Sequence, residues 1–433
     1  MVYGGDGLAR LPSADPGRSQ AVFVPFVLSG EKIEASLTEQ KSSFVRARAN
    51  SVLEKSPHRV EPSCPYFARC GGCDYQHASY PHQLEIKRDI LRENLQRIAR
   101  LELSRDIQLH PSPPWNYRNR SRLQVRALPE FSAGYFKRGS REVLAIEQCP
   151  ISSPLINRGI AALWDLGRTG KLPAGIEEVE FFANAEDTRL LLELSCVPNL
   201  HRKQARAGAE EFAASLPEIA GVTAFRHSGK SAPEPLVTVG DSSLNYQIGN
   251  AFYRVSAGSF FQTNRFLVEE LVQIVADGRS GDLVLDLYAG VGLFSTALTN
   301  FRHIISVESS QTSTADLTKN VPAHAKTVCD CAEHFLTGSG GAQVGKRGAL
   351  PHRLATPDFI VVDPPRSGLG ARVTGALAAL QAGKITYVSC DPATLARDLV
   401  PLLAAGYRVG EVHLVDLFPQ TFHLETIVHL HRS

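Results

Sequence analysis

The feature that most restricts the fold of this 433-residue chain is a repeated alternation of apolar runs and helical segments after about residue 250. The apolar runs are DLVLDLYAG, HIISVESS, AKTVCDC, DFIVVDPP, ITYVSCD and ETIVHLHRS. This alternation is typical of a doubly wound α/β sheet, whose ligands bind at the carboxyl ends of the strands. We therefore predict a Rossmann-like α/β domain over residues 246–433.

Two segments of different texture precede this domain. Residues 1–58 hold short strand-like runs separated by Gly, Pro and Ser, which predicts a small β-barrel. Residues 59–245 combine strand-like runs with one or two helices, which predicts a central α+β domain. Residues 80–100 carry apolar positions at three- and four-residue steps, and we expect this amphipathic helix to pack on the α/β domain.

Composition excludes several classes of protein. Hydrophobic residues at 43% and charged residues at 21% argue against a disordered, collagen-like or coiled-coil chain. The net charge is only +2, so a polyanionic partner must meet a local basic surface. No apolar run is long enough to span a membrane, and the start of the chain lacks the pattern of a signal peptide. We expect a cytoplasmic monomer, in which the eight cysteines are not in disulfides.

The turn after the apolar run LVLDL has the pattern of a nucleoside-binding turn. It reads Asp286-Leu-Tyr-Ala-Gly290-Val-Gly292 and is followed by a segment that we expect to be helical. Glycines allow close approach of a ligand, and Glu308 is placed to accept hydrogen bonds from a ribose diol. A third glycine and a Walker lysine are both absent, so the pattern favours S-adenosylmethionine over a dinucleotide or a triphosphate. A purely structural turn is the alternative.

Two further strand ends carry reactive side chains at the same edge of the predicted sheet. Asp363 follows DFIVV and is held there by Pro364 and Pro365. The Asp-Pro-Pro pattern is shared with amino-group methyltransferases, which have Tyr or Phe next, whereas this chain has Arg366. Cys390 follows ITYVS and precedes a predicted helix, whose N-terminus is expected to lower the pKa of the thiol.

Four other cysteines have the spacing of a metal centre. Three lie close together in a Gly-rich segment and the fourth is distant: Cys64, Cys70, Cys73 and Cys149. Four thiolates suit either zinc or an iron–sulfur cluster. Zinc ribbons use two Cys-x-x-Cys pairs, and the second pair is missing here, so the spacing favours a cluster.

Residues 111–141 interleave basic and aromatic side chains. Seven Lys or Arg residues stand there against one acid, Glu130. Arginines pair with phosphates and aromatic rings stack on unpaired bases, which suits single-stranded or looped RNA, and a solvated strand face is the alternative. The predicted RNA contacts are Arg118, Arg120, Arg122, Tyr135 and Phe136. The basic, Gly-rich residues 337–357 are either a second RNA contact or a plain insertion.

Together these motifs resemble the RNA 5-methyluridine methyltransferase family, over nearly the whole chain. Ser259-Phe-Phe-Gln262-Thr-Asn264 and His423-Leu-Glu425 add to the resemblance. It implies a TRAM barrel over residues 1–58 and a [4Fe–4S] cluster on the four cysteines. It also implies S-adenosylmethionine as cofactor, although Leu293 replaces an Asn of several members. The implied cofactor contacts are Gln262, Tyr288, Glu308 and Asp363, with Asp286, Gly290 and Asp330 as further candidates.

The chemistry of uracil then gives two residues a role. Carbon C5 is too weak a nucleophile to attack a sulfonium, so Cys390 is expected to add to C6 first and Glu425 to remove the C5 proton afterwards. The target uridine must be flipped out or unpaired, and 23S ribosomal RNA is the expected substrate. A transfer RNA T-loop is the alternative. An amino-group methyltransferase and a non-catalytic RNA-binding assembly factor would both leave Cys390 and Glu425 without a role.

Overall fold

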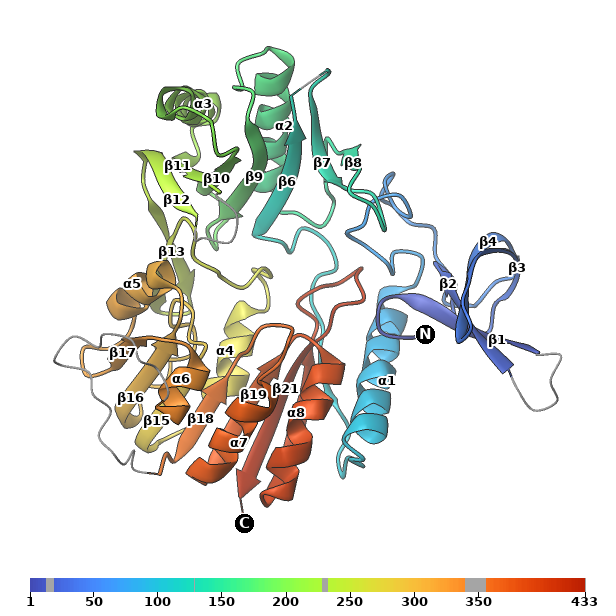
Figure 1. Ribbon diagram of the computed structural model, residues 1–433, viewed down its shortest axis with the longest axis vertical. Coiled ribbons are helices and arrows are strands. Elements are labelled where there is room, and N and C mark those ends of the chain that lie inside the picture. Colours follow the sequence, from blue (N-terminus) through green and yellow to red (C-terminus); the bar gives the residue numbers. More distant parts are fainter. Residues whose placement is uncertain (13–18, 128, 228–232, 339–355, 433) are drawn as a thin grey trace.

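The computed structural model describes residues 1–12, 19–127, 129–227, 233–338 and 356–432. Its strands form sheets of four, seven, two and eight strands. In Figure 1 the four-stranded sheet lies to one side, the seven-stranded sheet at the top and the eight-stranded sheet at the bottom. None of the helices in the described ranges is long and apolar enough to cross a membrane.

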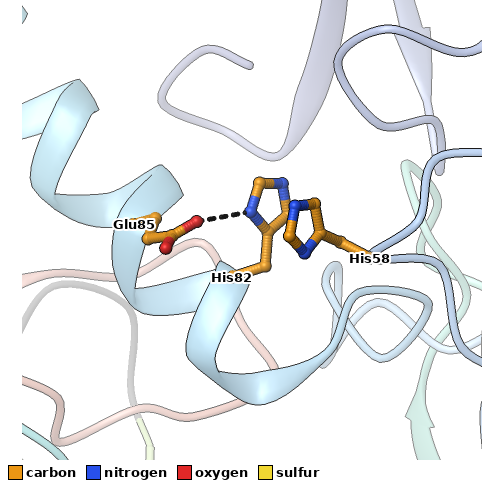
Figure 2. Close-up of side chains that lie close together, drawn as sticks. All are labelled: His58, His82 and Glu85. Carbon is orange, nitrogen blue, oxygen red and sulfur yellow. Dashed lines mark hydrogen bonds and ion pairs between the residues drawn. The ribbon is translucent and has the colours of Figure 1, made fainter.

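The N-terminal sheet has the strand order β1-β2-β4-β3 and a small core of Val and Ala side chains. The segment that follows this sheet contacts the helix Tyr80–Ile98 (Figure 2). His58 of the segment stacks on His82 of the helix, with ring centroids 4.0 Å apart. The Nδ1 atom of His82 is 2.8 Å from Glu85 Oε2. The strands are β1 (Asp6–Pro12), β2 (Ser19–Pro25), β3 (Lys32–Gln40) and β4 (Phe44–Glu54).

The central sheet has the order β12-β11-β10-β9-β6-β7-β8, and helices α2 and α3 contribute to its apolar core. The two-stranded sheet β13-β14 follows it and leads into the last sheet. These elements are β6 (Arg120–Arg126), β7 (Ser132–Phe136), β8 (Val143–Ala145), α2 (Pro154–Arg168), β9 (Ile176–Ala183), β10 (Leu190–Cys196), α3 (Arg202–Ser215), β11 (Ile219–Arg226), β12 (Glu234–Gly240), β13 (Ser243–Ile248) and β14 (Ala251–Ser256).

The eight-stranded sheet has the order β17-β16-β15-β18-β19-β21-β20-β5. Strands β15 to β19 run parallel, and β21 is antiparallel to both of its neighbours. The elements are α1 (Tyr80–Ile98), β5 (Gln108–His110), α4 (Val268–Ala276), β15 (Gly281–Leu287), β16 (Phe301–Glu308), α5 (Gln311–Asn320), β17 (Lys326–Cys329), α6 (Ala332–Thr337), β18 (Phe359–Val362), α7 (Gly370–Leu380), β19 (Lys384–Ser389), α8 (Pro392–Ala404), β20 (Tyr407–Val415) and β21 (Glu425–Arg432).

The apolar runs of this sheet are continuous because both of its faces are covered. Leu283, Leu285 and Leu287 of β15 pack in a core that includes side chains of α1, α6, α7 and α8. Val284 of the same strand packs in the opposite core, with α4 and the β13-β14 hairpin. Strands buried on both faces read as near-continuous apolar sequence rather than as an alternation, which is why these runs are conspicuous.

Two features differ from the expectations. The segment 288–300 after β15 forms turns instead of a helix, since Tyr288, Gly290 and Gly292 all have positive φ angles (63°, 55° and 93°) that interrupt helical geometry. Strand β5 lies within the residues expected to form the central domain but pairs with β20 of the eight-stranded sheet, whose core also includes side chains of α1. Most of the basic segment 337–357 lies outside the described residues.

Candidate active site

A cavity of about 670 Å³ opens at the carboxyl ends of β15, β18 and β19. Ligands of doubly wound sheets bind at this edge. The residues that line the cavity include Gln262, Tyr288, Gly290, Leu293, Glu308, Asp363, Cys390 and Glu425. The structure thus brings together side chains that are up to 163 residues apart in the sequence, from Gln262 to Glu425.

The glycine turn forms one wall of the cavity. A Cβ at Gly290 would meet no atom within 4 Å, so this position faces open space, whereas a Cβ at Gly292 would lie 2.8 Å from Leu317 Cδ1. Gly290 therefore allows approach of a ligand, and Gly292 allows close packing on α5. Glu308 is fixed at the end of β16 because its two carboxylate oxygens accept hydrogen bonds from the backbone N–H groups of Gly290 (2.9 Å) and Ser310 (2.6 Å).

Two carboxyl groups lack a cationic partner among the described residues: Asp363, which lines the cavity, and Asp286, which is buried behind the lining. Asp286 is fully buried, accepts a short hydrogen bond from the Ser295 hydroxyl, and has an Oδ1 atom without a partner. Burial raises the pKa of Asp286 to about 7. Burial, together with the nearby charge of Asp286, also raises the pKa of Asp363 to about 7. Two carboxyl groups without a cationic partner favour a ligand with positive charge.

Cys390 and Glu425 lie beside each other at the ends of adjacent strands. Ser389 is the Cα partner of Thr426 in the antiparallel pair β19-β21, so the next residue along, Cys390, lies beside Glu425. Burial raises the pKa of Glu425 well above its usual range, with a further contribution from Asp363. The thiol and the carboxyl group therefore share one half of the cavity with Asp363.

The structure does not support the expectation that the helix N-terminus lowers the pKa of Cys390. Burial, followed by the charges of Glu425 and Asp363, raises the pKa of this thiol to about 12. The first backbone N–H groups of α8 are already used, because Asp391 Oδ1 accepts hydrogen bonds from Ala393 (3.0 Å) and Thr394 (2.9 Å). Cys390 is consequently a protonated thiol in the ligand-free protein.

Arg366 and His423 complete this half of the cavity, and sequence reasoning gave neither of them a role. Arg366 Nη2 lies 3.2 Å from the His423 ring nitrogens, and its charge lowers the pKa of both Cys390 and Glu425. Burial, and then Arg366, lowers the pKa of His423 to about 3, so this ring is neutral. The sequence signal for a role of these residues was their place in two motifs, Asp363-Pro-Pro-Arg366 and His423-Leu-Glu425.

Asp330, like Asp286, differs in its place from the other predicted cofactor contacts. Among the described residues it is not part of the cavity lining. Its Oδ1 atom accepts a hydrogen bond of 2.8 Å from the backbone N–H of Cys331, at the start of α6. Its backbone N–H donates to the carbonyl of Glu308 at 3.0 Å, so Asp330 lies next to Glu308, beside the cavity rather than in its lining.

A second cavity, of about 730 Å³, is lined by Cys64, Cys70, Cys73 and Cys149. All four are free cysteines. Among the described residues, groups of three ligand atoms within 4.8 Å of one another occur in three places, and none of these groups includes the four cysteines. A tetrahedral zinc site would hold its sulfurs about 3.8 Å apart, given a Zn–S distance of about 2.3 Å. The four cysteine sulfurs are more widely spaced than this, because no three of them lie within 4.8 Å of one another. That spacing fits a polynuclear cluster better than a single zinc ion.

The basic and aromatic stretch divides into buried and exposed parts. Arg120 donates to the Ser259 carbonyl at 2.7 Å, lies 3.3 Å from Glu180 and covers the Phe182 ring, which favours packing over RNA contact. Arg122 pairs with Glu180 at 2.7 Å, but its side chain is 53% exposed. Arg118, Tyr135 and Phe136 line the cysteine cavity.

The sequence model of the tRNA (Uracil-5-)-methyltransferase family matches residues 79–433, which is most of the chain. The chain belongs to this family. It is therefore an S-adenosylmethionine-dependent RNA (uracil-C5)-methyltransferase.

Two similar proteins match this family member over nearly their whole length. An uncharacterized RNA methyltransferase of Aquifex aeolicus is 31% identical over 434 residues, covering 99% of this chain and 96% of that protein. The 23S rRNA (uracil(1939)-C(5))-methyltransferase RlmD of Shewanella amazonensis is 30% identical over 418 residues, covering 94% and 90%.

One solved structure has a similar fold. It is the Pyrococcus abyssi tRNA (uracil-54, C5)-methyltransferase in complex with S-adenosyl-L-homocysteine, with a TM-score of 0.73 and 23% identity. The similarity covers 98% of this chain and 99% of that one, so the fold extends over all three large sheets.

Proposed function

We propose that this methyltransferase forms 5-methyluridine in 23S ribosomal RNA, with Cys390 as nucleophile and Glu425 as base. The observation that carries the proposal is the pairing of these two side chains at adjacent strand ends, in the cavity that contains the glycine turn. A thiol and a carboxyl group so placed suit covalent addition to a ring followed by proton removal.

The cofactor site is proposed at the acidic half of the cavity. S-adenosylmethionine, when bound, supplies the methyl group and a positive charge. Gln262, Tyr288, Glu308 and Asp363 would hold it, with Gly290 leaving room for its approach. The unpaired carboxyl groups of Asp286 and Asp363 suit a sulfonium, because an opposite charge favours their ionised forms.

The proposed chemistry begins at Cys390, which must lose its proton to solvent before it can attack. Arg366 favours this loss, since its charge lowers the pKa of the thiol. The Cys390 sulfur then forms a bond to C6 of the uracil, and the electron pair of the C5=C6 bond moves towards C5 and the O4 oxygen. Carbon C5 takes the methyl group as the bond between that group and its sulfur donor breaks, Glu425 in its ionised form takes the C5 proton, and the bond between the Cys390 sulfur and C6 breaks to return the thiolate. Overall, one methyl group replaces one proton.

The cysteine cavity is proposed to hold a [4Fe–4S] cluster on Cys64, Cys70, Cys73 and Cys149, supported by the wide spacing of their sulfurs. Methyl transfer needs no electron transfer, so such a cluster would shape the protein and its RNA surface. Residues 1–58, with the four-stranded sheet, are proposed to be a TRAM-like RNA-binding domain.

The RNA target is proposed from two similar proteins that are named for different RNA substrates. RlmD of Shewanella amazonensis is named for 23S ribosomal RNA, and the higher identity of this relative favours the same substrate here. The Pyrococcus abyssi structure is named for transfer RNA, which keeps a transfer RNA uridine as the second candidate.

Labelled S-adenosylmethionine tests these alternatives directly. The enzyme is incubated separately with unmodified 23S ribosomal RNA and with unmodified transfer RNA, and the labelled nucleoside is identified after digestion. We expect 5-methyluridine in the ribosomal RNA at least tenfold above the transfer RNA. Label confined to transfer RNA would assign the second target, and label in an adenine or a protein amide would refute uracil-C5 chemistry.

A further inference from the structure

A third cavity, of about 510 Å³, lies at the end of the eight-stranded sheet that is opposite the active site. Lys384 begins β19 and lines this cavity, whereas Cys390 directly follows the end of the same strand. At roughly 3.3 Å per residue, the two sites are about 20 Å apart along the strand. Any ligand in this cavity is therefore separate from the reacting uracil.

Basic residues stand in one row across three neighbouring strands of this cavity. His431 of β21 is the Cα partner of both Lys384 of β19 and Arg408 of β20. Opposite residues of antiparallel strands project to the same face of the sheet, so Lys384 and Arg408 point to one side, about 10 Å apart. Within the described ranges, neither of these two side chains has a hydrogen-bond or ion-pair partner.

Arg279 adds a third cation from the turn between α4 and β15. Its Nη2 atom is 3.0 Å from Nδ1 of His429, its guanidinium lies 5.3 Å from the centre of the Phe359 ring, and its Nε atom is buried without a partner. Burial lowers the pKa of Arg279, and the charge of Glu411 opposes this shift. A half-buried cation whose direct partner is an imidazole would be stabilised by an anion beside it.

A β-bulge shapes the floor of the cavity. The register of β20 and β21 shifts between Val409 and Val412, so Gly410 and Glu411 together face His429. A bulge of this kind redirects the side chains of its strand. Glu411 is the carboxylate in the described lining, and it pairs with Arg105 at 3.3 Å. Lys384, Arg408 and Arg279 have no ion pair with any carboxylate in the part of the chain that the structure describes.

We propose that this cavity binds a phosphate group between Lys384, Arg408 and Arg279. Guanidinium groups match phosphate oxygens in pairs, and a lysine ammonium adds a point charge, so the two kinds of cation suit one anion. The phosphate group belongs either to the backbone of the RNA or to free phosphate. The first source rests on the proposed function, and the second does not. The chemistry of recognition is the same for both sources.

Isothermal titration with inorganic phosphate tests the site. The Lys384→Gln/Arg408→Gln variant should bind at least tenfold more weakly than the wild type, or bind one phosphate fewer per chain. The control is Lys319→Gln/Lys326→Gln, which removes the same charge from exposed positions outside the cavity. Affinity for S-adenosylhomocysteine, unchanged in both variants, shows that they are folded and separates this test from that of the proposed function.

Binding of an oligoadenylate at several salt concentrations distinguishes the two sources of phosphate. If RNA supplies the phosphate, the cavity variant should reduce the salt slope of RNA binding by about one to two, and the control should not. If the cavity variant loses inorganic phosphate binding but keeps the salt slope of RNA binding, the site binds free phosphate. The proposal is overturned if the wild type and the cavity variant bind phosphate equally, or if the control variant loses as much.

Discussion

At the scale of single residues, the carboxyl groups of Asp286 and Asp363 should make cofactor binding depend on pH. Asp286 and Asp363 have pKa values raised to about 7, so both ionise as the pH rises through neutrality. A sulfonium cation favours the ionised carboxylates, whereas the sulfur of S-adenosylhomocysteine is neutral. We expect S-adenosylmethionine to bind at least threefold more tightly at pH about 8 than at pH about 6.

Calorimetry with both cofactor forms provides the comparison. S-adenosylhomocysteine carries the same amino acid and nucleoside groups, so its affinity should change much less over the same pH range. Equal pH dependence of the two ligands would show that these carboxyl groups do not respond to the sulfonium charge.

Arg366 is a cation beside the proposed reacting pair, Cys390 and Glu425. Its charge lowers the pKa of Cys390 and Glu425, so Arg366→Gln should raise both values. We expect the pH profile of methyl transfer to move upward by about one unit, which is about a tenfold loss of rate at fixed pH on the acidic side. Arg366→Lys keeps the charge and should restore most of the profile. A uniform loss at every pH in both variants would indicate a positioning role only.

Sequence reasoning found much of this site, for a physical reason. Asp363 and Cys390 directly follow strands that are buried over most of their length, and Glu425 begins a third, and such strands are visible as apolar runs. Arg366 and His423 were harder to assign because their effect depends on contacts across 57 residues of sequence. Arg120 was assigned to RNA from composition, and its partners Glu180 and Ser259 come from other elements that composition does not reveal.

At the scale of elements, the attachment of α1 to the eight-stranded sheet rests on a buried ion pair. Lys87 Nζ lies 2.6 Å from Asp416 Oδ1, and both side chains are fully buried. The ammonium also donates to the Phe418 carbonyl at 2.9 Å, and the Tyr80 hydroxyl donates to Asp416 at 3.0 Å. This network holds α1 beside the loop that leads to Glu425.

Breaking this pair should be costly. Lys87→Met leaves a buried carboxylate without its partner, and we expect a loss of about 3 to 5 kcal/mol in the free energy of unfolding, measured in urea. Arg97→Met removes an exposed pair with Glu93 (2.8 Å) on the same helix and should cost less than about 1 kcal/mol. Equal effects of the two changes would contradict a structural role for the buried pair.

The elements that sequence reasoning missed are those whose identity depends on distant partners. Strand β5 has three residues and exists because it pairs with β20, more than 300 residues later. Strand β20 contains Gly410 and a bulge, which weaken its apolar pattern. The helix expected after β15 is replaced by turns because Tyr288 adopts a left-handed conformation that a pattern of residue types does not predict.

At the scale of the whole molecule, the cysteine cavity links two parts of the chain. Cys64, Cys70 and Cys73 lie between β4 and α1, and Cys149 lies after β8. A cluster would join these segments, so we expect anaerobically purified protein to contain about four irons per chain. Cys73→Ser should lose the iron and lower the melting temperature, while Cys329→Ser, at an exposed cysteine elsewhere, should keep both. Stoichiometric zinc without iron would contradict the cluster.

The division of labour between Cys390 and Glu425 is the central claim, and trapping the covalent intermediate tests it most directly. Glu425→Gln is incubated with the RNA and with S-adenosylmethionine labelled in its methyl group, and the products are separated on a denaturing gel. Since Cys390 is intact, the variant should add to the uracil and transfer the methyl group, then stop before elimination. We predict a protein–RNA band that carries the label, and no such band for Cys390→Ala. A Glu425→Gln enzyme that turns over at the wild-type rate, or that forms no adduct, would contradict the account.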